Sequence, residues 1–220
     1  MNVVEFTALI FAGSVAAGFL GALTGLGGGV VIVPLLTIVF GVDIRYAIGA
    51  ALVSVIATSS GAAAAYVREG YSNVRVGMFL EIATTLGALA GTVVAVYLHA
   101  SAIAIVFGVV LIYSAYASLK QEPHGVADFG ADALATRLKM DSSYPTEHGF
   151  ESYHVRGVPA GFVLMFVAGV LSGLLGIGSG AVKVLAMDRV MKLPFKVSTT
   201  TSNFMIGVTA AAGAGIYLSR

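Results

Sequence analysis

A few polar and ionisable side chains stand inside long apolar stretches of this chain, and these are the residues that could do chemistry. Lys183 lies deep in an apolar stretch that starts at about residue 158. Burying an ammonium group in such a stretch costs at least ~2.5 kcal/mol. One interpretation is therefore a binding site for an anion or a counter-ion. The alternative is a side chain that extends from a helix end to a polar surface, since Asp188 and Arg189 follow closely.

A run of uncharged polar residues, Ser-Thr-Thr-Thr-Ser-Asn at 198–203, opens the last apolar stretch. Hydroxyl and amide groups can donate hydrogen bonds to an oxyanion without a fixed counter-charge. The candidates in this run are Thr200, Thr201, Ser202 and Asn203. The alternative is capping of a helix and hydrogen bonding between helices. Thr58 lies on a similar polar face, where packing between helices is the alternative to substrate binding.

Glu81 stands about one turn inside the apolar stretch 77–98. A carboxyl group in a medium of low dielectric constant holds a proton more readily than in water, so Glu81 is a candidate for proton coupling. Pairing with Arg75 at the edge of the stretch is the alternative.

Other reaction chemistry finds no support in the sequence. Cys is absent, and His124, His148 and His154 have spacings that match no metal motif. No nucleophile stands in a recognisable arrangement with a base, and no G-x-x-x-x-G-K-[ST] nucleotide-binding motif occurs. We therefore expect no enzyme activity, no metal and no cofactor.

The composition predicts where these side chains lie. Hydrophobic residues make up 58% of the 220 residues and charged residues 10%, against about 25% charged residues in an average soluble domain. Because so few charges cannot cover a water-soluble protein, we expect a membrane protein. The formal net charge of +1 offers no basic surface for nucleic acid. The expected partners are the lipid bilayer and a small anionic substrate, and formation of a homo-oligomer is left open.

The charged residues divide the chain into three parts, because ten of them lie between Lys120 and Arg156. We expect a first membrane unit at 1–119 with about four spans, a polar connector at 120–157, and a second membrane unit at 158–220. The connector is expected to form a short helix, a small hairpin or both. Since a helix needs about 20 apolar residues to cross the bilayer, the expected membrane segments are 6–40, 47–66, 77–98, 101–118, 158–190 and 197–218.

Two of these segments are too long for one straight helix, and each contains a cluster of glycines. We expect each to form one span, a non-helical turn at depth and a half-helix, within an all-α polytopic membrane protein. Glycine permits positive φ and close approach of a ligand or a helix, although small-residue packing between helices is an alternative. The candidates are Gly25, Gly27, Gly28, Gly29, Gly176, Gly178 and Gly180, with Ser179 among them. Pro34 is expected to sharpen the first break.

The two long segments belong to an internal repeat. Residues 16–69 match residues 167–220 without gaps at an offset of 151, which aligns Gly25 with Gly176 and Thr58 with Thr209. Paired broken helices are typical of secondary transporters, whose sites lie where the two breaks meet. The second copy has no counterpart of 77–98 and 101–118, so we expect two further spans in a complete pair.

The motif Gly-Ala-Leu-Thr-Gly-Leu-Gly-Gly-Gly-Val-Val-Ile-Val-Pro at 21–34 resembles the first-repeat signature of the sulfite exporter TauE/SafE family of membrane permeases. Gly-Leu-Leu-Gly-Ile-Gly-Ser-Gly at 173–180 resembles its second-repeat signature, and the resemblance covers nearly the whole chain. It implies a multi-pass inner-membrane exporter of small sulfur-containing anions, such as sulfite or organosulfonates. Where copy one has Ile32 and Pro34, copy two has Lys183 and Leu185, so Lys183 either strengthens anion binding or marks a different substrate.

We therefore expect a permease that works by alternating access through a site between the two broken segments. A passive anion channel and a membrane scaffold subunit without transport activity are the alternatives. If each long segment makes one crossing, more Lys and Arg residues lie in the loops at 67–76 and 119–157 than in the opposite loops, which places the connector in the cytoplasm by a modest margin. If a glycine break forms a re-entrant hairpin instead, the number of crossings changes and so does this orientation.

Overall fold

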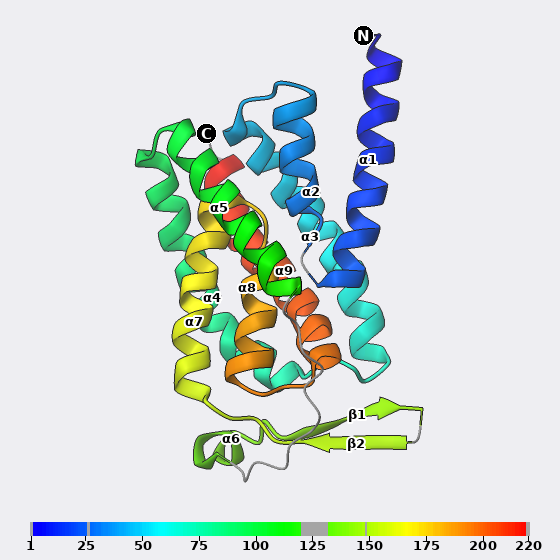
Figure 1. Cartoon of the computed structure of the whole chain (residues 1–220), viewed down its shortest axis with the longest axis vertical. Helices are drawn as coiled ribbons and strands as arrows, with labels where there is room; N and C mark the ends of the chain where they lie inside the picture. Colours follow the sequence, from blue (N-terminus) through cyan, green and yellow to red (C-terminus); the bar gives the residue numbers. More distant parts are fainter. Residues whose placement is uncertain (1, 26, 120–131, 148, 219–220) are drawn as a thin grey trace.

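The computed structural model describes the chain except for residues 1, 26, 120–131, 148 and 219–220 (Figure 1). The first unit contains α1 (Val3–Thr24), α2 (Gly29–Pro34), α3 (Ile44–Arg68), α4 (Val74–Tyr97) and α5 (Ala100–Leu119). The connector contains α6 (Ala133–Arg137) and the antiparallel strands β1 (Ser142–Thr146) and β2 (Gly149–Tyr153). The second unit contains α7 (Val158–Leu175), α8 (Gly180–Leu185) and α9 (Phe195–Leu218). Residues 120–131 of the predicted connector, with His124, lie outside the described residues.

Four of the described helices are long and apolar enough to cross a membrane, at Val4–Leu23, Ile44–Arg68, Val74–Tyr97 and Val158–Leu175. Much of their surface is apolar and exposed, as lipid-facing helices require. The prediction of an all-α membrane protein is confirmed.

Both long segments break at the predicted glycines. Helix α1 ends at Gly25 and α7 ends at Gly176, each in the left-handed conformation. The short helices α2 and α8 follow, and each continues into a π-helical turn, at Leu35–Val39 and Ala186–Val190. The prediction that Pro34 sharpens the break is wrong, because Pro34 is the last residue of α2 and lies a full turn beyond Gly29.

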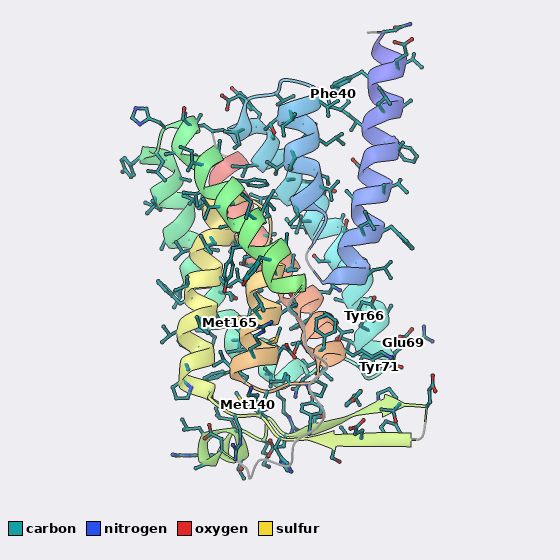
Figure 2. All side chains as sticks on the ribbon, in the orientation of Figure 1. Phe40, Tyr66, Glu69, Tyr71, Met140 and Met165 are labelled. Atoms are coloured by element: carbon teal, nitrogen blue, oxygen red, sulfur yellow. The ribbon has the colours of Figure 1, made fainter. Side chains whose placement is uncertain are left out.

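The first broken segment folds back on itself as an antiparallel hairpin. The Phe6 and Phe40 rings lie 5.0 Å apart in an edge-to-face arrangement. A Cβ atom at Gly28 would lie 3.2 Å from the carbonyl oxygen of Ala17, so the two arms are also close near the turn. Both arms of this hairpin therefore open at the same end of the molecule, where Phe40 lies (Figure 2).

The second broken segment forms the same kind of hairpin but opens at the opposite end. The Arg156 N–H donates to the Met191 carbonyl at 3.0 Å, and a Cβ atom at Gly157 would lie 2.8 Å from the Val190 carbonyl oxygen. Helices α1 and α7 consequently run in opposite directions (Figure 1). The expectation that each long segment makes one crossing is therefore wrong. Helices α2 and α8 return to the side of the molecule on which α1 and α7, respectively, begin.

Glycines allow α4 and α7 to pack with their backbones in contact. A Cβ atom at Gly87 or Gly91 of α4 would meet backbone atoms of Val170, and one at Gly169 or Gly173 of α7 would meet backbone atoms of α4. Both helices thus carry a G-x-x-x-G pair that permits close approach. This contact fixes the position of α4, which carries Glu81.

The connector packs on the end of the helices where the second hairpin opens. Asn73 caps α4 by accepting from the Val76 N–H at 3.1 Å, while its amide donates to the Met140 carbonyl and to the Tyr153 hydroxyl, both at 2.8 Å. The Asn73 N–H donates to Thr201 Oγ1 at 2.9 Å. Figure 2 shows Met140 and Tyr71 at this end, far from Phe40.

Candidate functional site

The two glycine turns meet inside the molecule. A Cβ atom at Gly29 would lie 2.9 Å from both the Gly176 carbonyl oxygen and the Ile177 Cα atom. A Cβ atom at Gly25 would lie 2.8 Å from the Thr199 carbonyl oxygen, and one at Gly176 would lie 3.1 Å from that of Ile48. No side chain fits at these positions. The close contacts alone therefore require glycine there.

The contacts of the two turns are reciprocal. Ile48 and Thr199 occupy matching positions of the sequence repeat, and so do Val55 and Ile206. Gly27 and Gly178 both face Val55 and Ile206 side chains. Each turn therefore packs against the long helix of the other half. Helices α2 and α8 and their π-helical turns also begin at matching positions.

Positive φ angles in the turns account for four glycines. Gly25, Gly27, Gly176 and Gly178 have φ values of 69°, 73°, 65° and 72°, which L residues with a Cβ atom rarely adopt. Gly28, with φ of −64°, is kept by its contact with α1 instead. Ser179 also has a positive φ, of 46°. A non-glycine residue in this conformation costs roughly 1–2 kcal/mol, so Ser179 is held there by its surroundings.

A cavity of about 170 Å³ adjoins the second turn. Its walls come from α5, from Val30 at the start of α2, and from residues 177 and 179–182, and they are largely apolar. The hydroxyls of Ser114 and Ser179 belong to its lining residues. Ser179 is buried, and its Oγ atom has no hydrogen-bond partner among the described residues. A buried hydroxyl without a partner is available to a ligand.

Lys183 lies one helical turn after Ser179, because its N–H donates to the Ser179 carbonyl at 3.1 Å. The side chain is fully buried, so the alternative that it extends to a polar surface is wrong. Its Nζ atom donates to Thr209 Oγ1 at 2.5 Å. The Thr209 hydroxyl lies 2.7 Å from Glu81 Oε1, which also accepts from Thr85 at 3.0 Å.

Lys183, Thr209 and Glu81 thus form one chain of polar contacts from α8 through α9 to α4. All three residues are buried, and Glu81 Oε2 has no hydrogen-bond partner among the described residues. Arg75, the other partner considered for Glu81, donates instead to the Lys139 carbonyl. A buried ammonium and a buried carboxylate compensate each other's charge, which makes both tolerable in an apolar interior.

The polar run 198–203 divides into two groups. Ser202 Oγ donates to the Gly25 carbonyl at 3.0 Å and contacts the Gly180 carbonyl at 3.5 Å, which ties α9 to both turns. Asn203 donates to the Ala22 carbonyl at 2.9 Å, and its Oδ1 atom is buried with no partner among the described residues. Thr200 donates to the Tyr71 carbonyl, so it and Thr201 hold the loop before α4 rather than the turns.

Thr58 is not brought to the site. Its hydroxyl donates to the Ser54 carbonyl at 2.9 Å and faces Gly18 of α1. Its repeat partner Thr209 occupies the central place instead. The signal for Thr209 was present in the sequence, as a threonine that recurs at the repeat offset on the second long helix. Thr84 and Thr85, three and four residues after Glu81, are further polar neighbours in the same network.

The described residues contain no group of His, Asp or Glu that could hold a metal ion. In the connector, His154 Nδ1 lies 3.4 Å from Asp141 Oδ2. The site therefore consists of glycine backbone, hydroxyls, one amide and the buried charges of Lys183 and Glu81.

Comparison with known proteins identifies the family of the chain. The chain is 29% identical over 219 residues to the "Probable membrane transporter protein YunE" of Bacillus subtilis (strain 168), a match that covers 95% of the chain and 77% of that protein. No solved structure matches the chain. The model of the family "Sulfite exporter TauE/SafE" matches residues 10–220. The family resemblance expected from the sequence is thereby confirmed, and the chain belongs to the TauE/SafE sulfite exporter family of membrane transporters.

Proposed function

We propose that this protein is a secondary transporter that exports small sulfur-containing anions, such as sulfite or organosulfonates, across the cell membrane. The observation that carries the proposal is the meeting of two oppositely directed glycine hairpins beside a cavity, with the buried cation of Lys183 one turn behind. Broken helices near the midplane are the usual substrate sites of transporters built from repeats. The family name and the description of YunE support this class of function.

The proposed binding site comprises the backbone of the two turns, the hydroxyls of Ser179 and Ser202, the Asn203 amide and the Lys183 ammonium. The Ser179 hydroxyl, which has no partner among the described residues, and the second Nδ2–H of Asn203 can donate to an oxyanion that must bind and then leave. Ser202 can do so by giving up its hydrogen bond to the Gly25 carbonyl. Alternating access follows if the two hairpins, which open at opposite ends, expose the cavity to one side at a time. We propose this movement as the mechanism.

We also propose that the connector faces the cytoplasm. The hairpin geometry places nearly all described basic residues outside the spans at the connector end, namely Arg68, Arg75, Arg137, Lys139, Arg156, Arg189, Lys192 and Lys196. Arg45, which donates to the Leu98 carbonyl, lies at the other end. Positive charge concentrates on the cytoplasmic side of membrane proteins. When each long segment is counted as a hairpin and not as one crossing, the excess of basic residues at the connector end is larger than the sequence analysis suggests.

The test is sulfite flux into proteoliposomes that contain the purified chain, with sulfate and methanesulfonate as competitors. Saturable flux that one competitor inhibits is expected. Lys183→Met should lower the apparent affinity about tenfold or more, because a charged hydrogen bond contributes about 1.5–3 kcal/mol. Lys192→Met, which removes an exposed lysine, is the matched control. Flux that rises without saturation would instead indicate a channel, and absence of flux would refute transport of sulfite by this chain.

A further inference from the structure

The two buried charges of the site, those of Lys183 and Glu81, are arranged in a way that can couple anion transport to proton movement. Lys183 on α8 and Glu81 on α4 are joined through the hydroxyl of Thr209 on α9, by contacts of 2.5 and 2.7 Å. The two halves of the molecule are therefore linked by a bridged pair of opposite charges, and the second oxygen of Glu81 is buried without a partner among the described residues.

We propose that Glu81 is the resident counter-charge of Lys183, that the transported anion takes its place, and that Glu81 then binds one proton, so that each monovalent anion moves with one proton. This proposal rests on the transport function proposed above and names its coupling. Before substrate binds, the Glu81 carboxylate occupies the role of the substrate anion beside Lys183. The Thr209 hydroxyl contacts both Lys183 and Glu81.

Charge accounting in the apolar interior supports the step. Without substrate, the ammonium of Lys183 and the carboxylate of Glu81 sum to zero. Binding of an anion to Lys183 would leave one uncompensated negative charge, which is costly in a medium of low dielectric constant. A proton from the aqueous phase on the Glu81 carboxylate restores the sum to zero, and the proton leaves when the anion leaves.

Other ionisable groups do not offer this compensation. Helix α7, which packs along α4, has no ionisable residue between Val158 and Leu175. On α9, the Lys196 ammonium lies 4.0 Å above the Tyr71 ring, at the connector end. On α4 itself, Arg75 binds the Lys139 carbonyl and Tyr97 is exposed at the far end. Asp188, which is buried, and Arg189 follow Lys183 on the π-helical turn after α8. Among the described charges of α4, α7, α8 and α9, Lys183 is the one joined to Glu81 through Thr209.

In this proposal the anion reaches Lys183 from the cavity. Residues 179–182 line the cavity, and Lys183, which is buried and not a lining residue, follows directly on the same short helix. The flexible lysine side chain can exchange one acceptor, the Thr209–Glu81 pair, for another that arrives beside Ser179. Release of Lys183 from α9 and α4 would loosen the contact between the halves, which links binding to movement.

The test measures protons and charge per transported anion in proteoliposomes of the full chain. Methanesulfonate, which keeps one negative charge, and sulfite are the probes, and an internal pH dye and a clamped membrane potential give the readouts. In the wild type, one proton should enter with each methanesulfonate ion, and an imposed potential should leave the rate unchanged. In Glu81→Gln, proton movement per anion should fall from one to zero and flux should become driven by potential.

With sulfite, the wild type should again move one proton more per anion than Glu81→Gln. Protons bound to sulfite itself are the same for both proteins and do not affect this difference. Glu147→Gln, an exposed connector carboxylate, is the matched control and should behave as the wild type. An equal proton count in wild type and Glu81→Gln, or wild-type methanesulfonate flux driven by potential, would overturn the coupling and leave the transport function standing. If Glu81→Gln does not fold, the coupling is tested by the wild type alone, whose methanesulfonate flux should not change with membrane potential. Absence of any anion flux in the wild type would refute the transport function and the coupling together.

Discussion

Single polar residues hold the connector against the membrane helices. The Asn73 amide joins the start of α4 to Met140 and to the Tyr153 hydroxyl of β2. Tyr153 is almost completely buried, and burial raises the pKa of its phenol to about 12, with the Asn73 hydrogen bond acting in the opposite direction. The neutral phenol is therefore the form that the folded connector favours.

This pKa shift predicts a loss of stability at alkaline pH. Because the folded-state pKa lies above the usual value of 10.0, the contribution of Tyr153 is complete below pH 10 and declines as pH rises through 12. The melting temperature of the detergent-solubilised protein, measured from pH 8 to 12, should show this decline. Tyr153→Phe should lower stability by about 1 kcal/mol at neutral pH and flatten the alkaline decline. Tyr46→Phe, exposed at the other end, is the control and should leave both unchanged.

The sequence identified the chemistry of single residues but not how they combine. Lys183 and Glu81 were both candidates because an ionisable residue in an apolar stretch is conspicuous. Their connection through Thr209 was not predictable, because it depends on how α4, α8 and α9 pack. Thr58 and Thr209 occupy matching positions of the repeat, but only Thr209 contacts buried charges, those of Lys183 and Glu81. The two halves have matching backbones but different side chains at the site.

At the scale of the elements, the two glycine hairpins determine the shape of the site. The breaks in both long segments were predictable, because more than 30 apolar residues cannot form one straight span and glycine clusters interrupt them. The direction of each half-helix was not predictable from length, since a continuing half-helix and a returning one have the same sequence pattern. The small-residue contact predicted at the turns exists, but glycines of α4 and α7 form a second one that was missed.

The close contact of the turns predicts that Gly29→Ala is strongly destabilising. The added Cβ atom would lie 2.9 Å from backbone atoms of the second turn, which cannot rotate away. A loss of about 1–3 kcal/mol, or loss of folding, is expected from such overpacking. Thermal unfolding in detergent measures this change.

Gly61→Ala on α3 is the matched control, because nothing lies within 4 Å of its added Cβ atom. This substitution should be neutral or stabilising by up to about 1 kcal/mol, since alanine is the better helix former. Equal stability of Gly29→Ala and Gly61→Ala would mean that the turns do not touch as described.

At the scale of the whole molecule, two hairpins enter from opposite ends and meet between long helices. This arrangement places the connector, the loop before α4 and the opening of the second hairpin together, and it concentrates basic residues there. The sequence alone gave a weaker charge bias because it counted each broken segment as one crossing. The proposed orientation therefore rests on a tertiary feature that composition does not contain.

Single cysteines test this orientation, and the chain provides a background without native Cys. Lys192→Cys should react with a membrane-impermeant thiol reagent only after the cytoplasmic side is made accessible. His99→Cys, exposed at the opposite end, should react from outside in intact cells. Labelling of both positions from the same side would contradict the hairpin geometry, because the two residues lie at opposite ends of the molecule.

The most direct test of the central claim is sulfite counterflow through the purified protein. Vesicles loaded with unlabelled sulfite are diluted into a trace of radiolabelled sulfite, and internal label is followed with time. A carrier that exposes one site alternately to each side predicts transient accumulation of label above its external concentration, which depends on the internal load. Label that only equilibrates, at a rate independent of the load, would contradict an alternating site between the two glycine hairpins.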